Sequence, residues 1–298
     1  MSGLPQMFTT STGIELAVSR YGRADAELTV VLAHCWTADR ADWDNQVRDL
    51  LAEFGRDVQI ITWDHRGHGE SAKIPKAECT VPNLAHDMGE ILDAFAPEGK
   101  LLLAGHSIGG MAMCALAEER PDLIERTVGA AFVSTSSGGM ETVTLGLPEM
   151  GPVLRAQIPR LLALRSLTLS RKARRRAPVV ERLVVRNFVI GHPMHLADAA
   201  YVVEGIINSP AATMVGFYED IIHNHERTAA LKAFTGIPTR VLVGTRDVLT
   251  PVSHARRIAN AIPGAELIIA PDAGHMLPLE RAELVSATLI KLARPHVP

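Results

Sequence analysis

Short apolar and β-branched runs alternate with segments of helical spacing through the first 135 residues. The runs occupy residues 29–34, 58–64, 100–107 and 126–135, and the helical segments residues 40–54, 81–95 and 109–120. Pro121 terminates the last of these segments. Runs without polar alternation are typical of strands that are covered on both faces, as in a parallel sheet. The pattern therefore predicts an α/β fold with a mostly parallel, doubly wound sheet.

The pattern changes in the middle of the chain. Strand signals disappear, and helical stretches rich in Leu, Val, Met and Arg are separated by prolines. Alternation then resumes, with strands expected at residues 239–245 and 266–270 and helices at residues 251–262 and 277–293. The simplest interpretation is one α/β core, residues 1–137 and 235–298, interrupted by an all-helical insertion at residues 138–234.

The most specific chemical signal is Gly105-His106-Ser107-Ile108-Gly109, which follows an expected strand and opens an expected helix. This G-x-S-x-G pattern is typical of a nucleophilic serine on a sharp strand–turn–helix connection. The backbone of such a serine is strained, and Gly105 and Gly109 remove side chains that would collide with it. The start of the helix also provides backbone N–H groups where an oxyanion would form.

With this turn, the chain resembles the α/β-hydrolase superfamily over its whole length outside the insertion. The resemblance implies the α/β-hydrolase fold, with the insertion as a cap, and a triad in the chain order serine, acid, histidine. His275 follows a late strand, where the family carries its catalytic histidine, and Asp247 lies just past the preceding strand. We therefore expect Ser107 as nucleophile, His275 as base and Asp247 as the group that orients the base.

The choice of acid has alternatives. Asp247 could instead cap the helix that begins near Pro251. Asp272 is a rival carboxylate, but it is too close to His275 in sequence to approach the other side of the imidazole. No carboxylate follows the strand that ends near Thr135, where some relatives carry their acid. Asp247 is the preferred assignment.

The resemblance also implies an oxyanion hole formed by the backbone N–H groups of Trp36 and Ile108. Cys35 stands where many relatives have glycine, and cysteine tolerates a positive φ poorly, so the local backbone geometry is in question. We interpret Cys35 as a small space-filling side chain rather than a nucleophile or redox switch. The His/Asp cluster at residues 64–71 is interpreted as bracing for these loops rather than as a metal site.

Apolar residues recur at helical spacing within the insertion, and such faces require burial. They are Val179, Val180, Leu183, Val184, Phe188 and Val189, then Met214, Phe217, Tyr218, Ile221 and Ile222. We expect most of them to pack among the cap helices and a minority to select an apolar acyl or alcohol group of a substrate. The basic run at residues 171–176 is interpreted as a solvated helix face, with attraction for an anionic substrate or an acyl carrier as the alternative.

The amino-acid composition limits the kinds of molecule that we expect this protein to bind. A net charge of −3 over 298 residues and an aromatic content of 4% give no indication of nucleic-acid binding. The three cysteines are odd in number and lack metal-ligand spacing, which favours a reducing compartment. With no signal peptide and no run of 18 apolar residues, we expect a cytoplasmic protein without a membrane span. No cofactor or metal is predicted, and a homodimer is one option that the sequence leaves open.

The sequence therefore predicts a serine hydrolase that cleaves a carboxylic ester or related acyl compound of an apolar small molecule through an acyl-enzyme. The same triad could serve carbon–carbon bond, lactone or thioester hydrolysis or peracid formation, because these reactions differ in the pocket. A third hypothesis is a non-catalytic protein that retains the scaffold to bind a ligand. A serine at the turn disfavours epoxide hydrolases and haloalkane dehalogenases, whose similar folds use a carboxylate there.

Overall fold

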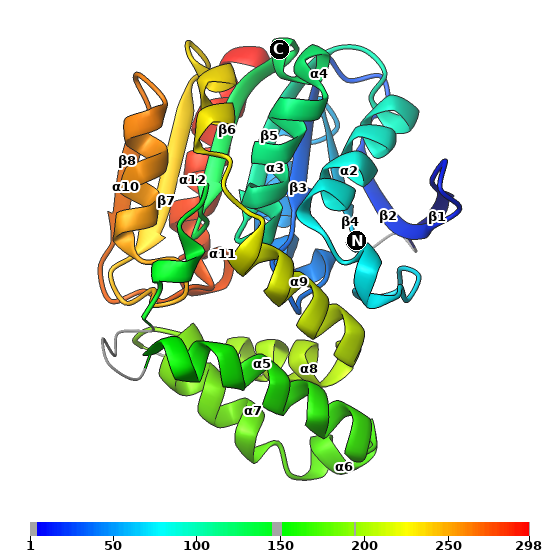
Figure 1. Ribbon diagram of the computed structural model, residues 1–298. Coiled ribbons are helices and arrows are strands. Elements are labelled where there is room, and N and C mark those ends of the chain that lie inside the picture. The colour runs from blue at the N-terminus through cyan, green and yellow to red at the C-terminus, as the bar shows by residue number, and fades with distance from the viewer. Residues whose placement is uncertain (1–4, 145–150, 194, 298) are drawn as a thin grey trace.

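The computed structural model describes residues 5–144, 151–193 and 195–297, and its centre is an eight-stranded sheet (Figure 1). The strands are β1 Gln6–Thr9, β2 Glu15–Gly22, β3 Leu28–Ala33, β4 Val58–Trp63, β5 Lys100–His106, β6 Thr127–Val133, β7 Thr239–Gly244 and β8 Glu266–Ala270. Their order in the sheet is β1-β2-β4-β3-β5-β6-β7-β8. Strands β4, β3, β5, β6, β7 and β8 run parallel, whereas β1 and β2 pair antiparallel at one edge. The predicted mostly parallel sheet is confirmed.

The sequence pattern located all the parallel strands and missed the edge hairpin of β1 and β2. Strand β1 has four residues, none of which is buried, and β2 is buried only at its centre. Neither strand therefore gives the continuous apolar run that marks a strand covered on both faces. Since β2 pairs antiparallel with β4, it extends the sheet without a crossover helix.

Helices cover both faces of the sheet. One core cluster contains side chains from α2 Val81–Phe95, α3 Ile108–Glu119 and α10 Val252–Ala261, and the other contains side chains from α1 Asp44–Phe54 and α12 Ala282–Ala293. Along β3, Val31 belongs to the first cluster and Val30 and Leu32 to the second, as the alternation of a strand requires. Full burial of each such side chain contributes about 1.5–3 kcal/mol.

The helix expected at residues 277–293 is two helices. Helix α11 Leu277–Glu280 ends at Arg281, whose backbone angles (φ −136°, ψ 48°) are not helical, and α12 begins at Ala282. The guanidinium of Arg281 donates to the carbonyl oxygen of Pro271 at 2.7 Å, and the Glu280 carboxylate accepts from the N–H groups of Gly274 and Met276. These hydrogen bonds to the loop before α11 stabilise the break between the two helices. The spacing of apolar residues alone does not reveal such a break.

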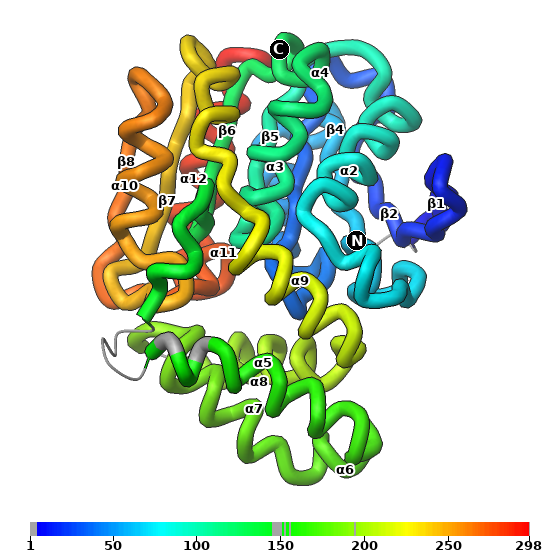
Figure 2. The backbone as a smooth tube through the Cα atoms, viewed as in Figure 1, coloured from blue at the N-terminus to red at the C-terminus, as the bar shows by residue number. Residues whose placement is uncertain are grey.

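Between β6 and β7 the described residues form helices and turns without a strand. The helices are α5 Gly151–Thr168, α6 Arg171–Arg176, α7 Val179–Val184, α8 Leu196–Asn208 and α9 Ala211–His223. Helices α5 to α8 form a layer that faces one end of the sheet, and the tube in Figure 2 shows α9 leading the chain back to the α/β layer. Asp220 on α9 accepts a hydrogen bond from the N–H of Val81, the first residue of α2, at 2.7 Å. This bond ties the helical segment to the core.

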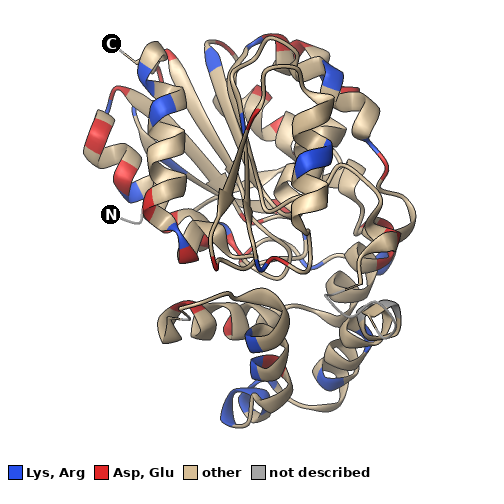
Figure 3. Ribbon diagram, turned by 90° about the vertical axis from the view of Figure 1, so that its left-hand side faces the viewer, with Lys and Arg blue, Asp and Glu red and all other residues tan. Residues whose placement is uncertain are grey.

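Two expectations for this segment hold for most of the residues concerned but not for all. Val179 and Leu183 are 59% and 51% exposed, because α7 turns Glu181 inward, where its carboxylate pairs with Arg165. Four of the five basic residues at 171–176 are exposed, as expected of a solvated face, but Arg174 is buried and donates to the carbonyl oxygen of Ile207 at 2.6 Å. This basic run, which Figure 3 shows as blue ribbon in the helical layer, meets the C-terminal end of α8, where cations are favoured.

None of the helices among the described residues is long and apolar enough to cross a bilayer.

Candidate active site

Ser107 lies on the sharp turn between β5 and α3. Its φ of 54° is in the left-handed region, which is strained for a residue with a side chain. A Cβ on Gly109 would lie 2.2 Å from the carbonyl oxygen of Ala33, and one on Gly105 would lie 2.4 Å from a backbone nitrogen of α3. Thr135, which lies two residues past the end of β6, holds the turn by donating to the carbonyl oxygen of Ser107 at 2.6 Å. The two glycines are therefore required by close backbone approach, as the sequence indicated.

The structure brings Ser107, His275 and Asp247 together. The Ser107 hydroxyl lies 2.9 Å from Nε2 of His275, and Nδ1 of His275 lies 3.0 Å from Oδ2 of Asp247. The three side chains follow β5, β8 and β7, whose carboxyl ends meet at one edge of the sheet. Because the carboxylate accepts from Nδ1–H, Nε2 is left as the acceptor for the serine hydroxyl. All three residues are buried.

Asp247 is held as an ionised carboxylate. Oδ1 accepts from the N–H groups of Leu249 and Thr250, and Oδ2 accepts from the Thr250 hydroxyl at 2.8 Å. Burial raises the pKa of Asp247, but the attraction of His275 and these hydrogen bonds outweigh burial and hold that pKa below its usual range. The residue that caps α10 is Pro251, so Asp247 does not serve as that cap. The rival carboxylate, Asp272, is exposed.

The backbone geometry at Cys35 resolves the question raised by its replacing glycine. Positive φ falls two residues later, at Thr37 with a φ of 63°, so the conformation of Cys35 suits a side chain. The N–H of Cys35 donates to Oδ2 of Asp42 at 3.1 Å. Burial and Asp42 raise the pKa of the Cys35 thiol well above its usual range, which keeps the sulfur protonated. A space-filling role fits these observations better than a nucleophilic one.

Trp36 lies in the loop after β3, and Ile108 follows Ser107 directly and begins α3. Over the described ranges, no acceptor occurs for the backbone N–H of either residue. The Cys35–Trp36 peptide is fixed from its other end, because Nδ1–H of His34 donates to the Cys35 carbonyl oxygen at 2.7 Å. In a trans peptide the N–H points away from the carbonyl, so this bond fixes the direction of the Trp36 N–H.

The segment at residues 64–71 braces the same loop. The N–H of His65 donates to Nε2 of His34 at 2.8 Å, and Nε2–H of His65 donates back to the carbonyl oxygen of His34 at 3.0 Å. Burial lowers the pKa of His65 to about 3 and that of His68 to about 4, so both rings are neutral.

Sequence reasoning missed His106, the residue before the serine, and Asp42. Nδ1 of His106 lies 2.7 Å from Oδ2 of Asp42, and Nε2 of His106 lies 2.8 Å from the backbone carbonyl oxygen of His275. Both side chains are fully buried. A histidine inside the serine motif was a visible signal, but its carboxylate partner lies 64 residues earlier in the chain and only the fold brings it near.

One cluster among the described residues has the atoms for a metal site: Sγ of Cys35, a carboxylate oxygen of Asp42 and a ring nitrogen of His106 lie within 4.8 Å of one another. A metal would need a thiolate and a free ring nitrogen. Both nitrogens of His106 form hydrogen bonds, and the Cys35 thiol is held protonated. The cluster therefore fits a hydrogen-bonded pair rather than metal ligands.

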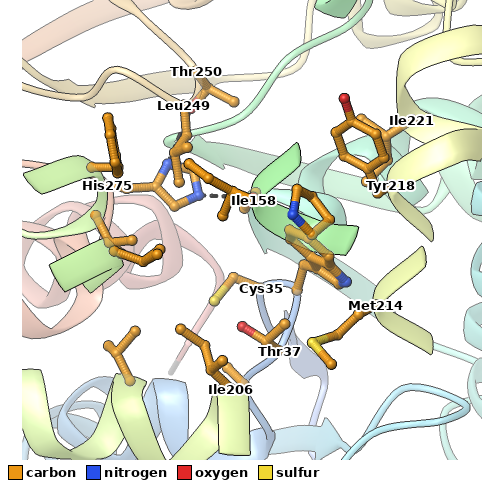
Figure 4. A pocket seen from close by; sticks show the side chains of 18 of the residues that line it. Cys35, Thr37, Ile158, Ile206, Met214, Tyr218, Ile221, Leu249, Thr250 and His275 are labelled. Atoms are coloured by element: carbon orange, nitrogen blue, oxygen red, sulfur yellow. Dashed lines mark hydrogen bonds between the residues drawn. The ribbon is translucent and has the colours of Figure 1, made fainter. Parts of the chain in front are cut away.

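A cavity of about 160 Å³ opens onto Ser107 and His275. Its walls are mainly apolar side chains from both the helical layer and the core, as Figure 4 shows around His275. Helical residues that line it include Ile158, Leu162, Ile206, Met214, Tyr218 and Ile221, and core residues include Cys35, Trp36, Thr37, Leu249 and Thr250. A ligand in contact with Ser107 would therefore lie in apolar surroundings.

A family model described as the alpha/beta hydrolase family matches residues 30–288. The chain belongs to this family. It is 26% identical over 286 residues to the Agrobacterium fabrum protein named "Putative carbamate hydrolase RutD", a match that covers 92% of this chain and 97% of that protein. This α/β-hydrolase also shares its fold with an esterase from Thermogutta terrifontis, with a TM-score of 0.75, 24% identity and full coverage of both chains. An enol-lactonase from Burkholderia xenovorans gives a TM-score of 0.71 at 23% identity, covering 97% of this chain and 100% of that one. The predicted family and fold are confirmed, and the protein is a hydrolase.

Proposed function

We propose that this α/β-hydrolase is a serine hydrolase that cleaves a carboxylic ester or related acyl compound through an acyl-enzyme. The observation that carries the proposal is the hydrogen-bonded series of Ser107, His275 and Asp247, with distances of 2.9 Å and 3.0 Å. A hydroxyl beside a neutral imidazole whose other nitrogen is fixed by a carboxylate can lose its proton as it attacks a carbonyl.

The reaction follows from these positions. Oγ of Ser107 bonds to the carbonyl carbon while Nε2 of His275 takes the hydroxyl proton, and the carbonyl oxygen becomes an oxyanion. The N–H groups of Trp36 and Ile108 stabilise this oxyanion, each by about 3 kcal/mol in the transition state. The imidazolium then gives its proton to the leaving alcohol as the carbon–oxygen bond breaks. A water molecule, deprotonated by His275, then attacks the acyl carbon, and the imidazolium returns this proton to Oγ of Ser107 as the bond between Oγ and the acyl carbon breaks and the acid leaves.

The cavity indicates the substrate class. Its mainly apolar walls favour a small acyl compound with an apolar group, because polar groups of a ligand would lose their hydrogen bonds to water there. We include in this proposal that residues 138–234 form a cap over the site, since side chains of α5, α8 and α9 line the cavity.

A carbamate is a second candidate substrate, and the name of the Agrobacterium fabrum relative is what favours it. A carbamate is a carbonyl compound that the same triad could attack. The apolar cavity favours esters with a hydrocarbon group over a small polar carbamate. Side-by-side turnover of a short p-nitrophenyl ester series and of a simple carbamate distinguishes the two.

Labelling with a fluorophosphonate probe tests the nucleophile. We expect the wild-type protein to form one covalent adduct at Ser107, because the probe reacts with an activated serine. Ser107→Ala should form none. Ser19→Ala is a matched control, because Ser19 is a buried serine on β2 whose hydroxyl has no hydrogen-bond partner among the described residues, and this variant should label as the wild type does. An unlabelled native wild-type protein would exclude the proposed mechanism and favour a ligand-binding scaffold.

A further inference from the structure

A second buried histidine–carboxylate pair lies behind the proposed triad. Asp42 belongs to the 3-10 turn Arg40–Trp43 and His106 ends β5. One oxygen of Asp42, Oδ2, lies 3.1 Å from the N–H of Cys35 and 2.7 Å from Nδ1 of His106. Nε2 of His106 then lies 2.8 Å from the carbonyl oxygen of His275. A continuous hydrogen-bonded series therefore joins the loop after β3 to the residue before Ser107 and to the histidine loop.

The contacts define the charge state of the pair. A backbone carbonyl oxygen only accepts, so Nε2 of His106 carries a proton. Oδ2 of Asp42 accepts from the Cys35 N–H and also faces Nδ1 of His106, an arrangement that favours a proton on Nδ1 and a negative charge on the carboxylate. This arrangement is an imidazolium paired with a carboxylate. Burial lowers the pKa of His106, but the adjacent Asp42 charge and hydrogen bond outweigh burial and raise it.

We infer that Asp42 and His106 act together as positioning residues, which hold the Trp36 N–H and the His275 imidazole in place around Ser107. The inference rests on the proposed function. Neither side chain lines the cavity among the described residues, so neither contacts the substrate. Asp42 acts through Cys35, whose carbonyl belongs to the peptide that carries the Trp36 N–H. His106 acts through the backbone of His275 itself.

The positioning role requires that His106 be positively charged and residue 42 negatively charged. Asparagine at position 42 could place its single oxygen where Oδ2 lies and accept both bonds, but His106 would then be an imidazolium without a counter-charge. If His106 became neutral instead, it could keep a proton on Nδ1 or on Nε2 but not on both, so it could no longer donate both to residue 42 and to the His275 carbonyl oxygen. Since a buried ion pair costs desolvation and adds little net stability, its value here is a single fixed geometry.

The test compares Asp42→Asn and His106→Gln with Glu181→Gln as a matched control. Glu181 is also fully buried and ion-paired, at 3.1 Å to Arg165, but this pair joins α7 to α5 and does not contact the loops around Ser107. Each variant is assayed well below its unfolding midpoint for kcat and KM on a short p-nitrophenyl ester and for the rate of fluorophosphonate labelling. We expect kcat and the labelling rate to fall about 100-fold in the two pair variants, as for a misplacement of about 1 Å, with KM within about threefold. The control should lose stability and keep both rates.

Rates within about threefold of the wild type in both pair variants would overturn the inference, as would an equal loss in the control. If Asp42→Asn does not fold, His106→Gln carries the test, because glutamine retains an amide donor for the His275 carbonyl. If the wild-type protein itself is not labelled, the proposed function fails rather than this inference. Amide hydrogen exchange then decides: faster exchange at residues 34–38 and 273–277 in the pair variants alone supports positioning, and unchanged exchange refutes it.

Discussion

The hydroxyl of Ser107 and Nε2 of His275 lie 2.9 Å apart although 168 residues separate them in the chain. Strands β5 and β8 are not neighbours in the sheet, since β6 and β7 lie between them. The imidazole reaches the serine because β8 ends in a loop that Glu280 fastens by accepting hydrogen bonds from the N–H groups of Gly274 and Met276 at 2.8 Å and 2.9 Å. The contact thus depends on a whole network rather than on two side chains.

Removing the Ser107 hydroxyl should abolish most of the activity without unfolding the protein. We expect Ser107→Ala to lower kcat on a short p-nitrophenyl ester by on the order of 1,000-fold or more, because no acyl-enzyme can form. The Ser19→Ala control should keep its activity. Circular dichroism and the urea midpoint should show that Ser107→Ala is folded. Activity near the wild-type value in folded Ser107→Ala would rule out Ser107 as the nucleophile.

The glycine at position 109 should be intolerant of even one methyl group. The Cβ of Gly109→Ala would lie 2.2 Å from the Ala33 carbonyl oxygen, so β3 and α3 must separate. We expect the free energy of unfolding to fall by about 2–3 kcal/mol or more. Gly264→Ala is the comparison, because Gly264 has a φ of 85° but open space around its Cβ, so only about 1 kcal/mol of backbone strain is added. Equal losses in the two variants, measured by urea unfolding, would contradict the close approach.

The buried histidines should make the protein less stable in mild acid. Burial holds the pKa of His68 at about 4, below the 6.5 of an exposed histidine, so the unfolded chain binds more protons than the folded one between these values. The free energy of unfolding therefore falls as the pH drops below 6.5, by up to about 1.4 kcal/mol per pH unit for this one residue. His65, with a pKa of about 3, adds to the effect in the same direction.

Urea unfolding at pH 7.5 and pH 5.0 measures this loss. His68→Gln should reduce the difference between the two pH values by about 2 kcal/mol, because glutamine does not titrate and still has a donor for the Arg66 carbonyl that His68 contacts. An unchanged difference in His68→Gln would show that the ring is not held neutral in the folded state.

The size of the cavity should limit the acyl group. Ile206 on α8 lines the cavity beside the site, and Ile206→Phe would fill part of its 160 Å³. We expect kcat/KM to fall at least tenfold for a hexanoate or longer p-nitrophenyl ester and to change less than threefold for the acetate, since one or two methylenes in an apolar pocket are worth about 1–3 kcal/mol. Equal effects across the ester series would place the acyl group elsewhere.

Much of the fold could be read from local patterns because the central strands are covered on both faces. Continuous apolar runs marked β3 to β8, and glycine spacing marked the turn at Ser107. The sequence pattern missed the edge hairpin because β1 is exposed. It also missed that Val179 and Leu183 point outward, because Glu181 takes the inward position on α7. The backbone conformation at Cys35 could be learned only from the structure, which places the positive φ of this loop at Thr37 and not at Cys35.

The sequence by itself determined which segments are strands and helices, where the chain turns sharply, and which residue types could carry an acyl transfer. These features depend on side-chain periodicity and on backbone preferences within a few residues. Tertiary structure alone decided that Asp42 lies against His106 and that His106 reaches the carbonyl of His275. Such contacts join residues far apart in the chain, and strand order and close packing, rather than any local pattern, bring them within hydrogen-bond distance.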